Sequence, residues 1–178
     1  MSIKPLIRSL YESPMTGDEI EAKSFETIDA EAQVSGFSPG QWAVVRRLVH
    51  ASADFNLVDQ IRFSENAIDA GMRALRSGSK IYVDSKMILS GLSLPRLRRV
   101  SLDYSPERLM CHVSDPDVVT MSKETGLPRS LHAVRKSAPK LELMSLGVEF
   151  IAIEGRRGGS PLAVATVHAL CELAVLPA

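Results

Sequence analysis

The sequence is poor in cysteine and in aromatic residues, and neither sign of charge is in excess. Its two cysteines, Cys111 and Cys171, lie in separate apolar segments, which excludes a CxxC metal or redox motif and suits buried thiols in a reducing compartment. Lysine plus arginine and aspartate plus glutamate number 21 each, so the overall charge favours neither nucleic acid nor an anionic membrane as a partner. No apolar run approaches the roughly 18 residues of a membrane span, and no secretory signal is seen, so we expect a cytoplasmic protein.

What remains is a pattern of short apolar strands that alternate with helical segments. With 178 residues, 45% of them hydrophobic, the chain is long enough for one domain with a full core. We predict a single-domain, layered α/β fold over residues 1–178, with a largely parallel sheet flanked by helices. Strands are expected at residues 80–84, 107–113 and 148–153, a proline- and arginine-rich connection at 92–106, and helices that begin at Thr16, Ser38, Ser64 and Pro161 or span 117–125, 130–138 and 140–146. Thr16 and Ser38 each stand three residues before a Glu or Gln, which is the spacing of a capping box.

A loop of glycines and arginines, GRRGGS at residues 155–160, follows the last predicted strand. Ser160 suits the N-cap of the next helix, and Pro161 suits its first position, where no amide is needed. Free backbone amides, the positive end of the helix dipole and two guanidinium groups would together form an anion site, while a plain turn remains an equal alternative. The loop is neither a Walker A loop nor a Gly-x-Gly-x-x-Gly motif, so a nucleotide is not the favoured anion.

Ligands in open α/β sheets collect at the carboxyl ends of strands, where loops meet helix N-termini. Three features of the sequence belong to such ends. They are Asp84, the loop at 155–160 and, less directly, the turn near Asp115.

His50 is the first candidate for chemistry. On a helical wheel it falls beside Arg46 and Arg47 and opposite Leu48, so it is not expected to fill the core. It lies in the last helical turn, where the dipole favours the protonated ring and the arginines oppose it. The alternative is an ordinary histidine at a helix end. The other histidines do not pair with His or Cys at ligand spacing, so we expect no metal site; they are His112, His132 and His168.

Three polar side chains are weaker candidates. Arg129 lies at a helix junction, where it would bind a ligand carboxylate with two hydrogen bonds or simply be solvated. Asp84 would orient a ligand or cap the short helix that ends at Gly91, and the capping role is favoured. From the sequence pattern alone, Ser24 is an ordinary hydroxyl on a helix. No serine or cysteine lies in a recognisable nucleophile motif.

Several of these residues stand in an order that resembles the precorrin-8X methylmutase family of cobalamin biosynthesis, including its cobalt-precorrin-8 form. Each motif is weak by itself, but their shared order covers nearly the whole chain and is specific. The motifs are EAKSFETI at 21–28, RRLVHA at 46–51 with Asp54, Ala74-Leu75 with Gly78, Asp84 with Met87 and Gly91, Arg129-Ser130, and GRRGGS at 155–160.

The resemblance implies an isomerase whose substrate is a reduced, acidic tetrapyrrole. A methyl group would move from C11 to C12 of the ring to give hydrogenobyrinate or its cobalt counterpart, with no cofactor, in a homodimer whose active site lies near the subunit interface. His50 would be the general acid that protonates the macrocycle, a role that suits a histidine. Substrate contacts would come from Ser24, Asp84, Met87, Arg129, Arg156, Gly158, Gly159 and Ser160.

The sequence departs from the family pattern after Pro139. Family members have a further helix and strand there, whereas this chain runs directly into Lys140. A genuine deletion would remove a strand and part of the pocket, which would leave a non-catalytic protein that binds a tetrapyrrole or another polyacid. If the chain instead has further residues at this point, activity would be retained.

Overall fold

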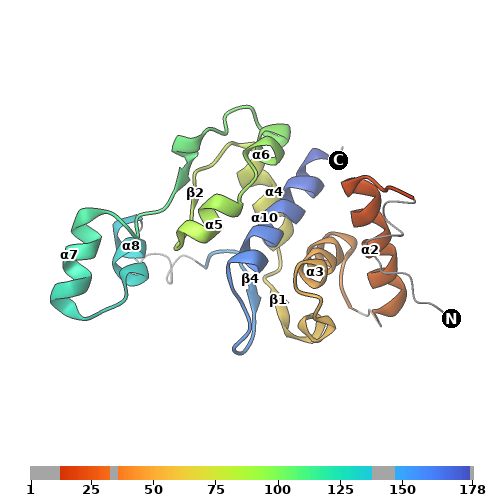
Figure 1. Ribbon diagram of the computed structural model, residues 1–178, viewed down its shortest axis with the longest axis horizontal. Coiled ribbons are helices and arrows are strands. Elements are labelled where there is room, and N and C mark those ends of the chain that lie inside the picture. The colour runs from red at the N-terminus through yellow and green to blue at the C-terminus, as the bar shows by residue number, and fades with distance from the viewer. Residues whose placement is uncertain (1–12, 33–35, 138–146, 177–178) are drawn as a thin grey trace.

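The computed structural model describes residues 13–32, 36–137 and 147–176 and is rich in helices (Figure 1). The α-helices are α2 (Gly17–Glu31), α3 (Pro39–Ser52), α4 (Ala67–Arg76), α5 (Lys86–Gly91), α6 (Leu94–Val100), α7 (Pro116–Thr125), α8 (Arg129–Ser137) and α10 (Ser160–Val175). Two 3-10 helices, η1 (Phe55–Gln60) and η2 (Pro106–Arg108), and four strands, β1 (Ile61–Phe63), β2 (Ile81–Tyr82), β3 (Leu109–Met110) and β4 (Ile151–Ile153), complete the described elements.

The described strands form two small sheets. β1 and β4 pair antiparallel, with Phe63 opposite Ile151, whereas β2 and β3 pair parallel, with Ile81 opposite Leu109. The predicted α/β class is therefore confirmed, but a largely parallel sheet is not. The strands are also shorter than predicted, in part because Pro106 starts a 3-10 turn that takes up the beginning of the segment expected at 107–113.

Helix α10 forms the centre of the core. It lies between α3 on one side and α4, α5 and α6 on the other (Figure 1). Its buried side chains meet an apolar face of α3, and each buried Val or Leu there contributes about 1.5–3 kcal/mol. Close packing on the α5 side requires Gly91, because a Cβ atom there would lie 2.7 Å from Cγ2 of Val164. The buried residues of this contact are Val44, Val45, Leu48, Val49, Leu162, Ala165 and Ala169.

Local capping signals predicted some helix starts correctly and others wrongly. Thr16 and Ser38 form complete capping boxes, as expected. Ser64 does not cap α4, whose N-cap is Asn66; its hydroxyl instead bonds Glu149 and the Phe150 carbonyl, beside β4.

The segment at 92–106 was predicted as a connection, but it contains helix α6. The hydroxyl of Ser93 accepts a hydrogen bond from the Arg96 amide, and Pro95 lies in the first turn, where its missing amide costs nothing. Both features are start signals that the arginine-rich composition obscured.

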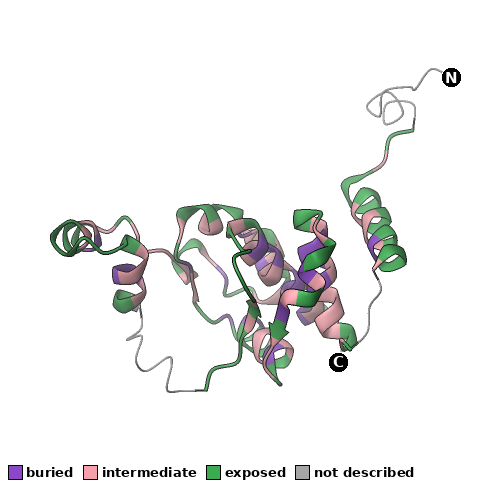
Figure 2. Ribbon diagram, turned by 90° about the horizontal axis from the view of Figure 1, so that it is seen from below, coloured by how far each residue is buried: buried purple, intermediate pink, exposed green. Residues whose placement is uncertain are grey.

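Helices α7 and α8 pack against each other and form an arm at one end of the molecule, opposite α2 (Figures 1 and 2). Val118 and Ala133 are buried in this pair. Both helices were predicted at nearly these bounds, whereas the helix expected at 140–146 lies outside the described residues. Both cysteines are free, and Cys171 is buried as expected, but Cys111 is only half-buried. In the described part of the chain, no helix is long and apolar enough to span a membrane.

Candidate active site

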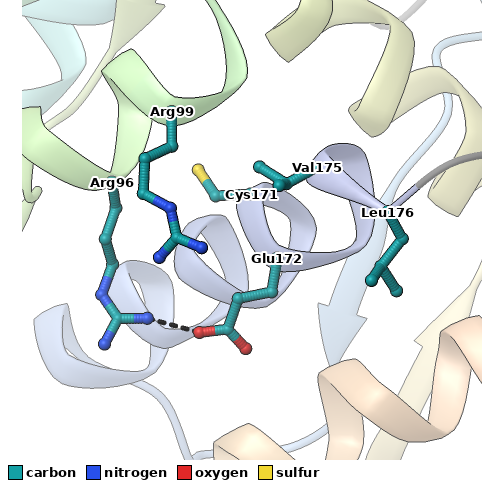
Figure 3. A pocket seen from close by; sticks show the side chains of 6 residues that line it. All are labelled: Arg96, Arg99, Cys171, Glu172, Val175 and Leu176. Atoms are coloured by element: carbon teal, nitrogen blue, oxygen red, sulfur yellow. Dashed lines mark hydrogen bonds and ion pairs between the residues drawn. The ribbon is translucent and has the colours of Figure 1, made fainter.

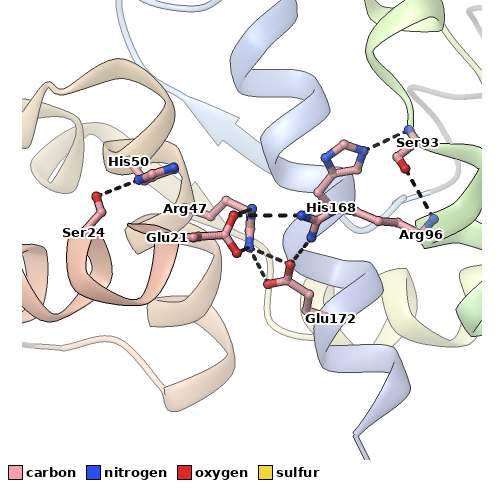
Figure 4. Close-up of polar contacts among 8 residues, drawn as sticks. All are labelled: Glu21, Ser24, Arg47, His50, Ser93, Arg96, His168 and Glu172. Atoms are coloured by element: carbon pink, nitrogen blue, oxygen red, sulfur yellow. Dashed lines mark hydrogen bonds and ion pairs between the residues drawn. The ribbon is translucent and has the colours of Figure 1, made fainter. Parts of the chain in front are cut away.

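His50 and Ser24 come together across the contact between α3 and α2 (Figure 4). The Oγ of Ser24 lies 2.7 Å from Nδ1 of His50, and the ring of Phe25 meets the imidazole edge-on at 5.3 Å. Within the described residues, Nδ1 is the ring nitrogen that has a hydrogen-bond partner, so Nε2 remains for a ligand. The ring is thus held at one end and available at the other.

This arrangement suits a general acid. When the imidazole is protonated, Nδ1–H donates to the Ser24 hydroxyl and Nε2–H can be given to a bound molecule. After the transfer, the proton that remains on Nδ1 keeps its acceptor. In such a reaction Ser24 would select which nitrogen of His50 gives up a proton, a role that the sequence alone had not assigned to it.

Arg47, which lies on the same side of α3 as His50, is buried with an exposed fraction of 6%. It is buried because α3 is covered by both α2 and α10. The two guanidinium nitrogens Nη1 and Nη2 each lie 3.0 Å from a carboxylate oxygen of Glu21, and Nη2 lies 2.6 Å from Glu172 (Figure 4). Arg96 of α6 also binds Glu172, so four helices meet in one ion-paired group.

The charges in this group stabilise one another. Burial alone would lower the pKa of Arg47, but its bonds to Glu21 and Glu172 outweigh burial and raise that pKa. The hydrogen bonds from Arg47 hold the pKa of the Glu21 carboxyl below its ordinary value. Sequence reasoning missed Glu172 and Arg96, because their contact joins α6 and α10 across 76 residues of sequence.

The remaining histidines already have partners in the chain. Nε2 of His168 accepts a hydrogen bond from the Ser93 amide at 3.1 Å, and burial lowers the pKa of His168, which favours the neutral ring (Figure 4). His132 lies 2.9 Å from Thr125, and His112 lies 2.9 Å from Asp115. Among the described residues, no group of three or more His, Cys, Asp or Glu side chains could hold a metal ion.

The glycine loop leads from β4 into α10 as predicted, but its details differ. Gly155 and Gly159 have φ values of +87° and +125°, which glycine adopts without strain. The N-cap of α10 is Gly159, and Ser160 is the first helical residue, so the predicted capping role of Ser160 is wrong. Its hydroxyl lies 3.2 Å from that of Ser85, the residue that caps α5.

The contact between Ser160 and Ser85 joins the loops that follow β4 and β2. The sequence predicted such a meeting at the edge of one largely parallel sheet, whereas β2 and β4 belong to different small sheets. Asp84 precedes Ser85 and is exposed, and it does not cap α5, so the favoured capping interpretation of Asp84 was wrong. Met87 lies in the first turn of α5 with an exposed fraction of 69%.

The two arginines of the loop differ in their surroundings. Nε of Arg157 lies 3.2 Å from the carboxylate of Asp54, which follows the end of α3 one turn after His50. This ion pair places the loop beside the histidine end of α3. Arg156 is exposed and has no ion pair within the described residues, so its charge, like the loop amides at Gly158 and Gly159, is accessible to a ligand.

Arg129 lies elsewhere. It begins α8, is exposed, and belongs to the arm at the end of the molecule opposite α2 (Figures 1 and 2). One copy of the chain therefore does not bring Arg129 to His50.

Two hollows in the described structure do not contain the histidine. One, of about 190 Å³, lies at the end of α10 between Arg96, Arg99 and Glu172 (Figure 3), and it is smaller than the roughly 300–1,000 Å³ of ordinary ligand sites. Burial raises the pKa of its cysteine, Cys171, to about 11, so this thiol is unreactive near neutral pH. The other, of about 790 Å³, lies between α4, α10 and β4 and is mainly apolar.

Comparisons with known proteins agree with these features. The model of the precorrin-8X methylmutase family matches residues 19–143 and 137–173. The cobalt-precorrin-8 methylmutase of Leptospira interrogans serogroup Icterohaemorrhagiae serovar Lai is 38% identical over 121 residues, which cover 68% of this chain but only 53%, about half, of that relative. The cobalt-precorrin-8 methylmutase of Priestia megaterium is 29% identical over 202 aligned positions, with 88% of each chain covered. The crystal structure of precorrin-8x methyl mutase from Thermus thermophilus has a TM-score of 0.72 and 33% identity, covering 89% of this chain and 97% of that chain.

One difference from these relatives is internal. The alignment with the Priestia megaterium protein has 202 positions, more than the 178 residues of this chain, so the relative has residues without a counterpart here. The family model matches in two pieces that meet at residues 137–143. The difference therefore falls where the sequence departs from the family pattern.

The matched pieces contain the residues on which the resemblance rested. Ser24, His50, Asp84 and Arg129 lie in the first piece, and the glycine loop lies in the second. The matching relatives are named as methylmutases, which are isomerases that move a methyl group in corrin synthesis. The chain belongs to the precorrin-8X methylmutase family.

Proposed function

We propose that this chain moves a methyl group from C11 to C12 of precorrin-8X or cobalt-precorrin-8, with His50 as the general acid. The observation that carries the proposal is the 2.7 Å contact between Ser24 and Nδ1 of His50, which leaves Nε2 to face a ligand. Relatives named for the metal-free and the cobalt-containing substrate both match, so the two forms are proposed together.

His50 acts by giving the proton on Nε2 to the macrocycle. The positive charge that results on the conjugated ring draws the methyl group, with its bonding electron pair, from C11 to C12, and the proton is then returned. A positioned general acid typically contributes about 10² to 10⁴ in rate. The reaction is an isomerisation, so no cofactor enters the proposal.

The carboxylates of the macrocycle bind at the glycine loop. Arg156, the amides of Gly158 and Gly159 and the Ser160 hydroxyl supply charge and hydrogen bonds, and the N-terminus of α10 adds its dipole. Asp84 and Met87 line the site from the neighbouring helix start. Carboxylate rather than phosphate is therefore the anion that this loop holds.

The proposal includes a homodimer in the cytoplasm. A second copy would supply Arg129, whose arm lies away from His50 of its own chain. The two free cysteines fit a reducing compartment.

A non-catalytic tetrapyrrole-binding protein is the second candidate. The observation in its favour is the internal shortening around residues 137–143. The retained pairing of His50 with Ser24 favours the enzyme, because a protein that only binds has no need to orient this ring.

Incubation of the purified protein with precorrin-8 separates the two candidates. The enzyme converts it to hydrogenobyrinate, which is followed by the change in the absorption spectrum and by chromatography of the product. Tight binding of substrate and product without conversion would instead establish the binding protein.

A further inference from the structure

The Ser24–His50 contact has a neighbour with the same geometry. Glu21 and Ser24 lie three residues apart on α2, and Arg47 and His50 lie three residues apart on α3. Residues at this spacing share one helix face. The Glu21–Arg47 ion pair and the Ser24–His50 contact therefore form two adjacent cross-links between the same helices, as Figure 4 shows.

Helix α2 depends on such cross-links for its position. Ile28 is its one fully buried residue among those described, and Phe25 packs partly against the core. A third polar cross-link lies farther along α2, where Asp29 accepts hydrogen bonds from Trp42 and Arg46, both at 2.7 Å.

The Arg47 and Asp29 cross-links differ in burial and in whether a third helix also binds the arginine. The side chains of Arg46 and Asp29 are 29% and 40% exposed, whereas Arg47 is 7% exposed. Arg47 is also held from the other side by Glu172 of α10. The Arg47 cross-link therefore ties α2 to both α3 and α10, and the Asp29 cross-link ties it to α3 alone.

We propose that Arg47 is a positioning residue for His50: by holding Glu21, it fixes α2 so that the Ser24 hydroxyl stays on Nδ1 of His50. The proposal rests on the proposed general-acid role of His50. The Arg47 guanidinium touches neither His50 nor Ser24 by hydrogen bond in the described structure, so it acts through the placement of α2. A displacement of about 1 Å in a catalytic contact can cost about 10² in rate.

The test compares Glu21→Gln with Asp29→Asn, a matched change from carboxylate to amide on the same helix. Turnover of precorrin-8 and substrate affinity are measured, together with the ¹⁵N NMR signals of the imidazole rings, of which the chain has four. The Ser24→Ala variant shows where the ¹⁵N signal of His50 lies when Nδ1 has lost the Ser24 hydroxyl as its partner. Arg47→Lys is the second variant, because a lysine keeps the charge but cannot form paired bonds to Glu21.

Glu21→Gln and Arg47→Lys are expected to lower kcat by up to about 10²-fold with KM nearly unchanged, and to move the His50 signal toward that of Ser24→Ala. Asp29→Asn is expected to behave as wild type in both measurements. Wild-type turnover or a wild-type His50 signal in Glu21→Gln would overturn the proposal, as would an equal loss in Asp29→Asn. If the wild-type protein converts no substrate, the proposed function fails, while the NMR comparison still decides whether Arg47 positions the pair.

Discussion

Two pairs of successive helices pack together, α2 with α3 and α7 with α8, and they are held in different ways (Figure 1). In the first pair, α3 packs on α10, and a buried arginine of α3 lies between carboxylates of α2 and α10. The second pair has a small apolar contact of its own and exposed ion pairs from Lys136 to Asp115 and Asp117. Residues on the first pair are therefore positioned by the chain itself, whereas Arg129 on the second is carried at the surface.

This difference leads to a prediction about mixed dimers. If α7 and α8 contribute to the active site of a second copy, one His50→Ala chain paired with one Arg129→Ala chain forms a dimer in which one of the two sites has both residues intact. Co-expressed variants carrying different tags are isolated as mixed dimers and assayed for turnover of precorrin-8. Activity well above that of either variant alone is expected, and no gain over the separate variants would place Arg129 outside the shared site.

A second prediction concerns the stability of the two pairs. Leu48 is 1% exposed in the contact of α3 with α10, and Leu48→Ala is expected to cost about 2–5 kcal/mol in the free energy of unfolding. Val118→Ala, in α7, removes fewer atoms from a smaller cluster and should mainly increase hydrogen exchange within α7 and α8. Urea unfolding measures the global free energy of unfolding, and amide exchange measures local opening of α7 and α8. A larger loss of unfolding free energy in Val118→Ala than in Leu48→Ala would contradict this prediction.

A smaller effect is expected for the pH dependence of stability that Glu21 gives to the contact between α2 and α3. Hydrogen bonds from Arg47 depress the pKa of Glu21 below its ordinary value of 4.5 in the folded state. Ionised Glu21 therefore stabilises the fold above pH 4.5, and this contribution is lost as the pH falls through the depressed pKa. The difference in Tm between wild type and Glu21→Gln should shrink from neutral pH to about pH 3, and a constant difference would contradict it.

The smallest effect is expected at Lys136. Its Nζ lies 2.7 Å from Asp115 and 3.0 Å from Asp117, but Lys136 and Asp117 are exposed and Asp115 is only half-buried, and ion pairs in contact with solvent contribute little to stability. Lys136→Met should therefore leave Tm unchanged within error in a thermal scan. A clear fall in Tm would show that charge, rather than apolar contact, holds the arm.

The sequence predicted those parts of the fold whose signals are local. Thr16 and Ser38 carry complete capping boxes, and both helices begin there. Ser64 and Ser160 carry similar signals, but tertiary partners, Glu149 and Ser85, take their hydroxyls instead. Strand extent also depends on partners that lie far away in the sequence, which is why the predicted largely parallel sheet was not confirmed.

The candidate site was predictable to a similar degree. The motif order identified His50 and the glycine loop, and the structure adds the contacts that join them to Ser24 and Asp54. The burial of Arg47 follows from the contacts of α3 with both α2 and α10, which the sequence of α3 alone does not show. Glu172 belongs to the same group through a contact across 125 residues of sequence, which no local pattern indicates.

The most direct test of the central claim is turnover of precorrin-8 by wild type and His50→Ala. His50→Ala should lose turnover by at least about 10², the low end of the contribution of a general acid, while it still binds the macrocycle. Near-normal turnover in His50→Ala would contradict the account, because another group would then have to protonate the ring.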